Sequence, residues 1–176
     1  MSMRTLIFTF ALLVGLQTTA DARAPLQFDE SFHNALSALP TIGSQPLGDT
    51  EGKIVIVTFF ASWCPPCRWE FKSLNAVCER YDEKDVAIVA VNWFEDWGNY
   101  KSGKRMQRFL ASTKPQFPLV EGTKTLTDKF GGVDRIPTLF VFDRNGREAF
   151  SFVHLQGAEK MHVETDELIG VLDALQ

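Results

Sequence analysis

Runs of consecutive apolar residues alternate along this chain with segments whose apolar residues recur every three or four positions. The run at 54–60 reads Ile-Val-Ile-Val-Thr-Phe-Phe, and further runs lie at 86–91, 138–142 and 147–153. Unbroken runs of β-branched and aromatic residues are typical of strands that are covered on both faces of a sheet. We therefore expect strands at these four places and a further short strand near 118–120.

Only Asp143-Arg144-Asn145-Gly146 separates the last two runs. Asn-Gly is a strong signal for a tight hairpin, because both residue types tolerate positive φ angles. These two strands are therefore expected to pair antiparallel, with positive φ at Asn145 and Gly146.

Helical spacing fills the intervals between the runs. From Cys67, apolar residues follow after four, three, four and three positions, which places one stripe along one helix face: Phe71, Leu74, Cys78 and Tyr81. Further helices are expected over 28–38, 102–112, 124–130 and 165–175. Thr165 is expected to be the N-cap of the last of these. This order of elements predicts an α/β fold with a central mixed β-sheet flanked by helices.

The first residues have the pattern of a secretory signal peptide. Arg4 precedes an apolar stretch from Leu6 to Leu16, and Ala22-Arg23-Ala24 offers small residues for cleavage after Ala24. The stretch is shorter than the ~20 residues of a transmembrane helix. Cleavage after Ala20 and an uncleaved anchor are the alternatives. We expect a signal peptide over 1–24, an N-terminal extension over 25–51 and one domain over 52–176, located in the periplasm or otherwise outside the cytoplasm.

Charge argues against a nucleic-acid partner. The 176 residues carry 18 basic and 22 acidic side chains, a net charge of −4, whereas phosphate contacts need clustered Lys and Arg. The one concentration of basic residues, from Lys101 to Arg108, is interpreted as the solvated face of a helix.

Cys64 and Cys67 lie between the first strand and the first long helix, in Trp63-Cys64-Pro65-Pro66-Cys67. A thiol at a helix N-terminus faces unpaired N–H groups and the positive end of the helix dipole, and both lower its pKa. Cys64 is therefore expected to attack a partner's disulfide, and Cys67 to resolve the mixed disulfide. A structural disulfide or half of a metal site are the alternatives.

Cys78 is interpreted as a core residue. It lies eleven residues beyond Cys67 on the apolar stripe, ~16 Å away along a helix and outside disulfide reach. A third redox thiol or a link between two copies are the alternatives.

Two segments resemble signatures of the thioredoxin superfamily, and within it of the exported TlpA/ResA-like thiol–disulfide oxidoreductases. Residues 57–68 are similar to the strand and active-site signature, and Arg68-Trp69-Glu70 to its continuation. Residues 132–143 are similar to the second signature, in which the residue matching Pro137 is a cis-proline beside the cysteines. The resemblance covers roughly residues 52–175 and implies a thioredoxin fold.

The resemblance also implies that the backbone of Ile136 pairs with an extended substrate segment. A cis bond before Pro137 is plausible on energetic grounds, because it lies only ~0.5–1 kcal/mol above trans for proline. The alternative is an ordinary trans-proline that opens a strand.

Two positions depart from thioredoxin itself. Thr58 stands where thioredoxin has a buried Asp, and Ala90 where it has that Asp's Lys partner. Glu70, three residues past Cys67, is a candidate substitute as proton acceptor; the alternative is a solvated carboxylate. The aromatic stretch 92–100 is interpreted either as a partner-binding surface or as a packed loop.

We expect an enzyme that exchanges dithiol for disulfide with protein substrates, with the reductase direction preferred. The resemblance implies work on cytochrome c or copper-site cysteines and a membrane-bound redox partner. The site residues are Cys64 and Cys67, supported by Trp63, Pro65, Pro66, Glu70, Ile136 and Pro137. No metal or cofactor is expected. The alternatives are a copper or haem handling module that binds through Cys64 and Cys67 with His154 or His162, and a thiol peroxidase.

Overall fold

The computed structural model describes residues 23–97 and 103–176. All but the last two residues of the signal segment predicted over 1–24 therefore lie outside the described residues. A five-stranded sheet in the order β3-β2-β1-β4-β5 forms the centre of the molecule. The strands are β1 (Ile54–Phe60), β2 (Val86–Asn92), β3 (Leu119–Glu121), β4 (Thr138–Phe142) and β5 (Glu148–Val153). The helices are α1 (Glu30–Ser37), α2 (Pro65–Arg80), α3 (Gly103–Thr113), α4 (Lys124–Lys129) and α5 (Thr165–Asp173).

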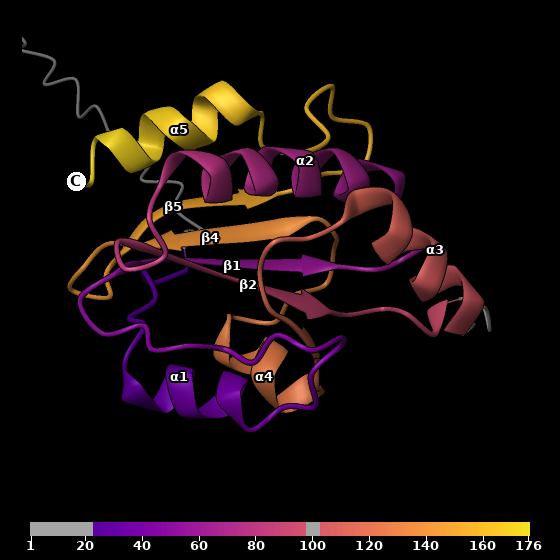
Figure 1. Ribbon diagram of the computed structural model, residues 1–176, viewed down its shortest axis with the longest axis horizontal. Coiled ribbons are helices and arrows are strands. Elements are labelled where there is room, and N and C mark those ends of the chain that lie inside the picture. Colours follow the sequence, from indigo (N-terminus) through magenta and orange to yellow (C-terminus); the bar gives the residue numbers. More distant parts are fainter. Residues whose placement is uncertain (1–22, 98–102) are drawn as a thin grey trace, which may run out of the picture.

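The sheet is mixed, as the order of elements predicted. β1 pairs in parallel with β2 and antiparallel with β4, and β4 and β5 form the expected hairpin. Helices cover both faces (Figure 1): α2, α3 and α5 lie on one side, α1 and α4 on the other. In the described part of the chain, no helix combines the length and the apolar character needed to cross a membrane.

All seven residues of β1 are buried, because each face of this strand packs against its own apolar cluster. Phe60 meets Phe71 of α2 on one side, with ring centroids 4.8 Å apart, and Phe59 meets Phe130 on the other, 5.1 Å apart. The unbroken apolar run of this strand is therefore explained by burial on both faces.

The segment before β1 packs on the α1–α4 side of the sheet. Asp29 caps α1 by accepting a hydrogen bond from the N–H of Phe32 at 3.0 Å, and the helix begins two residues later than expected. Phe32 and Leu36 enter the same cluster as Phe59. This segment thus covers one face of the central strand.

Two local expectations were wrong. Glu164, not Thr165, is the N-cap of α5, and the Thr165 hydroxyl instead bonds Ser73 Oγ at 3.1 Å. Only Gly146 of the hairpin turn has a positive φ, at 74°. The turn differs because Asp143 Oδ1 accepts from the N–H of Asn145 and Arg147, which stabilises a different turn conformation.

We expect Phe71→Ala to lower the free energy of unfolding by about 3–5 kcal/mol, the range found for buried aromatic truncations. Phe71 is fully buried and contacts the rings of Phe60, Phe109 and Phe117. Chemical denaturation measures the change. Phe150→Ala is the control, because Phe150 is only half-buried on β5; equal losses in the two variants would contradict the assignment of the core.

Candidate active site

The end of β1 and the start of α2 position the two cysteines. Cys64 is the N-cap of α2, with Pro65 and Pro66 in the first helical positions, where a missing N–H leaves no bond unmade. A disulfide joins Cys64 to Cys67, whose Cα atoms are 5.4 Å apart. The Cys67 N–H also donates to Cys64 Sγ at 3.2 Å, so a helix N–H faces the sulfur as the sequence predicted.

Both cysteines are buried in this disulfide form. Cys67 is 0% exposed and Cys64 2%, so Cys64 is not open to solvent in this form, whereas an attacking thiol has to be reached by its partner. The disulfide explains this difference, because it ties Cys64 Sγ to the buried Cys67. Pro65 is exposed and Pro66 is buried, and the order of reactivity in the reduced protein stays a prediction.

The Ile136–Pro137 peptide bond is cis, as predicted. Pro137 is buried and directly precedes β4, whose first residue, Thr138, pairs with Phe59 of β1. Pro137 and the end of β1 that leads to Cys64 therefore lie at the same edge of the sheet. Within the described residues, the backbone N–H and C=O of Ile136 make no hydrogen bond.

Glu70 is fully buried beside the cysteine helix turn. Its Oε1 accepts a hydrogen bond from Thr58 Oγ1, whereas its Oε2 has no partner among the residues that the structure describes. Thr58 pairs in register with Ala90. Thr58 and Ala90, which match the charged pair of thioredoxin, thus lie side by side on neighbouring strands without charge. The carboxyl group of Glu70 on α2 reaches Thr58 instead.

Burial raises the pKa of Glu70 to about 7. The cause is loss of hydration of the charged form, and the Thr58 hydroxyl only partly offsets it. A carboxyl group in this state can hold or release a proton near neutral pH. The interpretation of Glu70 as a solvated carboxylate is therefore excluded.

Glu95 holds the loop before Cys64, and no sequence pattern points to it. Its Oε2 accepts from the Ser62 N–H at 2.8 Å and from Asn92 Nδ2 at 2.9 Å, and its Oε1 accepts from Ser62 Oγ. Neither spacing nor composition marks this carboxylate, because it lies 33 residues from Ser62 in the chain.

The aromatic stretch after β2 packs against the same loop. Phe94 has a φ of 62°, a left-handed conformation that is uncommon outside glycine, and its C=O accepts from Trp63 Nε1 at 2.8 Å. Trp97 stacks on Trp63 with centroids 5.0 Å apart and is 65% exposed, whereas Trp93 Nε1 donates to Val133 O. The stretch is thus packed at one end and exposed at the other; residues 98–100 lie outside the described residues.

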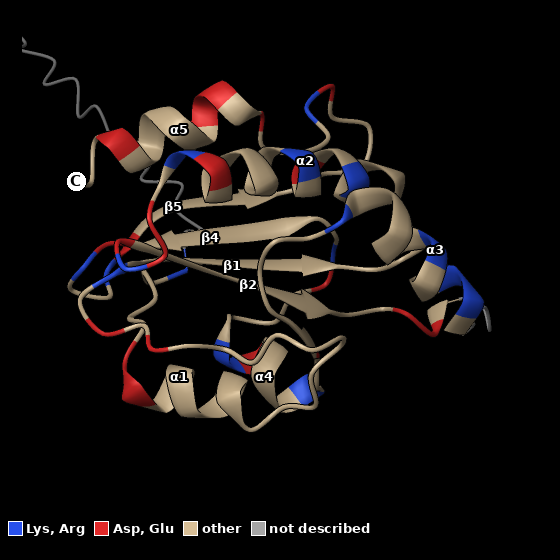
Figure 2. Ribbon diagram, viewed as in Figure 1, with Lys and Arg blue, Asp and Glu red and all other residues tan. Residues whose placement is uncertain are grey.

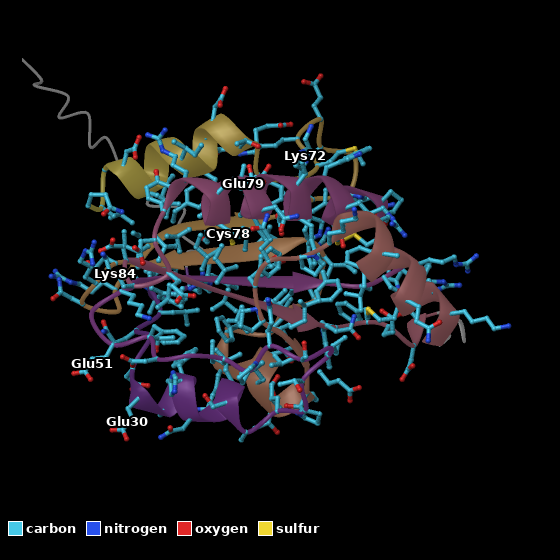
Figure 3. The ribbon with its side chains drawn as sticks, in the orientation of Figure 1. Glu30, Glu51, Lys72, Cys78, Glu79 and Lys84 are labelled. Carbon is cyan, nitrogen blue, oxygen red and sulfur yellow. A yellow bond between two sulfur atoms is a disulfide. The ribbon has the colours of Figure 1, made fainter. Side chains whose placement is uncertain are left out.

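Cys78 lies on the side of α2 that faces the sheet (Figure 3) but is only half-buried, at the edge of the core. Burial raises the pKa of its thiol to about 11. Its thiol lies 3.9 Å from the C=O of Gln116. These surroundings favour an unreactive thiol.

The histidines named for a metal site do not lie in a ligand cluster. His162 contacts the ring of Trp69 and lies 3.4 Å from Glu164 Oε1. Within 23–97 and 103–176, no group of three or more His, Cys, Asp or Glu side chains could hold a metal ion.

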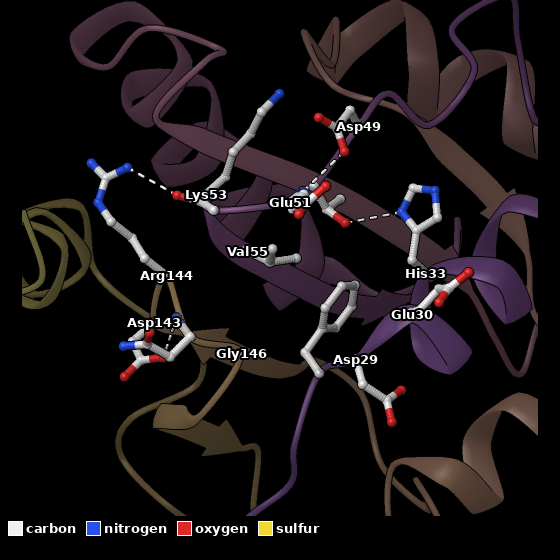
Figure 4. Close-up of a pocket in the computed structure, with 14 residues that line it drawn as sticks. Asp29, Glu30, His33, Asp49, Glu51, Lys53, Val55, Asp143, Arg144 and Gly146 are labelled. Atoms are coloured by element: carbon white, nitrogen blue, oxygen red, sulfur yellow. Dashed lines mark hydrogen bonds between the residues drawn. The ribbon is translucent and has the colours of Figure 1, made fainter.

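A separate pocket of about 490 Å³ lies at the opposite end of β1, next to the hairpin turn (Figure 4). Its His33 is held by two hydroxyl groups, with Nδ1 2.9 Å from Thr50 Oγ1 and Nε2 3.2 Å from Ser37 Oγ. Gly146 lines the same pocket, and a side chain there would clash with the C=O of Phe28. These contacts are structural and do not involve the cysteines.

The sequence pattern of the AhpC/TSA family matches residues 37–147. Thiol-disulfide oxidoreductase ResA of Geobacillus thermodenitrificans is 32% identical over 101 residues, which cover 57% of this chain and 55% of ResA. Sporulation thiol-disulfide oxidoreductase A of Bacillus subtilis is 24% identical over 165 residues, covering 93% of this chain and 98% of that protein.

Among solved structures, a thiol:disulfide interchange protein DsbE from Chlorobium tepidum is similar, with 31% identity and a TM-score of 0.56, over 76% of this chain and 91% of that one. The chain spans just over half the length of the curated relatives that match it at 32% identity. These similarities confirm the resemblance to TlpA/ResA-like proteins and the thioredoxin fold.

We expect the stability difference between the wild-type protein and Glu70→Gln to depend on pH. The raised pKa of about 7 means that the folded protein keeps a proton that the unfolded chain releases near pH 4.5. This bound proton therefore stabilises the folded protein fully below pH 4.5, and the stabilisation is lost as the pH rises through 7. The shift corresponds to about 3 kcal/mol.

Denaturant unfolding of both oxidised proteins between pH 4.5 and 8 measures this difference. Glu79→Gln is the matched control, because Glu79 is exposed on the same helix (Figure 3). If the difference in free energy of unfolding between the wild-type protein and Glu70→Gln is the same at every pH, Glu70 does not titrate in this range.

We expect Glu95→Gln to lower the free energy of unfolding by about 1–2 kcal/mol, because one of the two accepting oxygens becomes an NH2 group that cannot accept and the other becomes a neutral acceptor. Thermal or chemical unfolding measures the loss. Glu121→Gln makes the same chemical change at an exposed strand end. Equal stability of the two variants would argue against a role for Glu95 in holding the loop.

Proposed function

This chain belongs to the AhpC/TSA family, and from that membership we propose that it is an exported thiol–disulfide oxidoreductase acting on other proteins through Cys64 and Cys67. The observation that carries the proposal is the pair itself: a disulfide at the N-terminus of α2, with the Cys67 N–H donating to Cys64 Sγ. The names of the relatives, thiol-disulfide oxidoreductases and an interchange protein, support the same chemistry.

In the reductase direction, the Cys64 thiolate attacks one sulfur of a partner's disulfide. A Cys64–partner disulfide forms, the partner's own disulfide breaks, and its other sulfur leaves as a thiolate. The Cys67 thiolate then attacks Cys64 Sγ, which forms the Cys64–Cys67 disulfide and releases the second partner thiolate. Two electrons pass to the partner, and each released thiolate takes up a proton.

Helix α2 stabilises the first thiolate through its N-terminal N–H groups and its dipole. Cys67 must lose its proton while it is buried, so a nearby acceptor is required. Glu70 is on the same helix, is fully buried, has an unpartnered Oε2 and a pKa near 7. We assign it the role of proton acceptor for Cys67.

The surface that a partner approaches is shaped by five residues around the cysteines: Trp63, Pro65, Pro66, Ile136 and Pro137. The unbonded backbone of Ile136 can pair with an extended segment of the partner, as a strand added to a sheet edge does. Pro137 presents no N–H to the sulfurs.

The cellular setting belongs to the same proposal. Residues 1–24 act as a signal peptide, 25–51 form an extension packed on the domain, and 52–176 form the thioredoxin-like domain in the periplasm or its equivalent. A reductase in an oxidising compartment needs a supply of electrons, which we assign to a membrane-bound dithiol partner. Cysteines of cytochrome c or copper sites are the proposed substrates.

We expect the protein to accelerate the reduction of insulin disulfides by dithiothreitol. Cys64→Ser and Cys67→Ser should return the rate to that of dithiothreitol alone, because each variant removes one of the two exchanging sulfurs. Turbidity of the precipitating insulin chain measures the rate.

Cys78→Ala is the control and should keep the wild-type rate while losing ~1 kcal/mol of stability. A wild-type protein that does not accelerate reduction would contradict the proposed activity. Loss of activity in folded Cys78→Ala would make Cys78 a redox participant.

We expect iodoacetamide to modify Cys64 of the reduced protein before Cys67 and Cys78 at pH 7. The helix N-terminus favours the Cys64 thiolate, whereas burial raises the pKa of Cys78 to about 11. Peptide mapping of quenched samples gives the order, and the denatured protein should show similar rates at all three. Faster reaction of Cys67 would reverse the assigned roles.

A further inference from the structure

A pocket of about 720 Å³ lies directly beside the cysteine loop, between the start of α2 and α3. Trp63, Trp97, Arg68, Arg105, Arg108 and two serines line it. Trp63 directly precedes Cys64 in the chain, and Arg68 directly follows Cys67. An occupant of this pocket therefore contacts residues that directly flank the two cysteines.

The charge of this pocket is opposite to that of the whole chain. Among the described residues that line it, three carry a guanidinium group and none carries a carboxylate, although the net charge of the chain is −4. Figure 2 shows basic positions on α3 beside the first turns of α2, whereas α5 carries only acidic ones. Such a local excess of positive charge attracts anions.

Arg68 is held in place by the surrounding protein. Its Nη1 donates to Ser112 Oγ at 2.5 Å and its Nη2 to the C=O of Ser62 at 3.4 Å, and its guanidinium lies 5.0 Å from the ring centroid of Phe109. A fixed planar guanidinium loses little freedom when it binds a carboxylate. Arg108 is exposed and extends the same positive surface.

The aromatic side chains form the second half of the recognition surface. Trp97 stacks on Trp63 and is 65% exposed. A large exposed ring next to guanidinium groups can contact the apolar parts of a bound polypeptide, while the arginines bind its carboxylates.

We propose that this pocket binds an acidic segment of the partner protein that flanks the partner's reactive disulfide. The proposal rests on the proposed function and names its substrate class. The guanidinium groups of Arg68 on α2 and Arg108 on α3 line a pocket of about 720 Å³, which fits several carboxylates along a chain better than one small acid. Binding there would place the partner's sulfurs next to Cys64 and raise the rate of exchange.

The test uses two disulfide-bonded peptides that differ only at two residues flanking one cysteine, Glu-Glu in one and Gln-Gln in the other. Pre-reduced full-length protein reduces each in a single turnover at pH 7 and low salt. We expect the acidic peptide to react about threefold faster, as exposed ion pairs allow, and this ratio to fall with added salt.

Arg108→Gln should bring the ratio of the two rate constants toward one. Lys84→Gln is the matched control and should keep the wild-type ratio, because Lys84 is exposed at the end of the molecule away from α3 (Figure 3). A wild-type ratio of one, a ratio unchanged in Arg108→Gln, or an equal fall in Lys84→Gln would overturn the proposal.

A binding measurement separates this proposal from the activity itself. Cysteine-free versions of both peptides are titrated into the oxidised protein, and the fluorescence of the pocket tryptophans reports binding. If neither disulfide peptide is reduced, the proposed function fails. In that case, preferential binding of the acidic peptide that weakens in Arg108→Gln still supports the pocket, and equal binding of both peptides overturns it.

Discussion

The burial of β1 on both faces is the constraint on which the rest of the structure depends. Its seven residues are all buried, so helices must cover each side of the sheet. α2 follows β1 after only a few residues and covers one face, and this short connection places Cys64 at the junction of strand and helix. The position of the disulfide is thus a consequence of how the core is closed.

The same helix carries two opposite electrostatic environments. Its N-terminal N–H groups favour negative charge on Cys64. Six residues further, the buried surroundings of Glu70 disfavour negative charge and raise the pKa of its carboxyl group to about 7. The helix N-terminus can stabilise a thiolate on Cys64, and the carboxyl group of Glu70 can hold a proton. Together they suit a thiol–disulfide exchange that proceeds in two steps. Thr58 takes part by donating to Glu70 from the central strand.

The loop around the cysteines is fixed from a distant part of the chain. Glu95 accepts hydrogen bonds from Ser62, and Phe94 accepts one from Trp63. The segment after β2 therefore determines where the Trp63 ring lies, and Trp97 covers it. In this way the aromatic segment both supports the cysteine loop and forms part of the positively charged pocket beside it.

The sheet and the place of the cysteines were predictable from the sequence, and the cis bond before Pro137 from the family resemblance. Strand runs, helix stripes and the two proline-containing signatures are local patterns, and local patterns can be read along a chain. Three features became visible only in the tertiary structure. They are the hydrogen bonds of Glu95, the exposed face of Trp97, and the proximity of Arg68, Arg105 and Arg108. Each depends on which segments the sheet brings together, and long-range packing leaves no periodic signal in the sequence. Glu70 was predictable only in part. Its place on the helix after Cys67 follows from the sequence, whereas its burial, and hence its raised pKa, follows from the packing of α2 on β1.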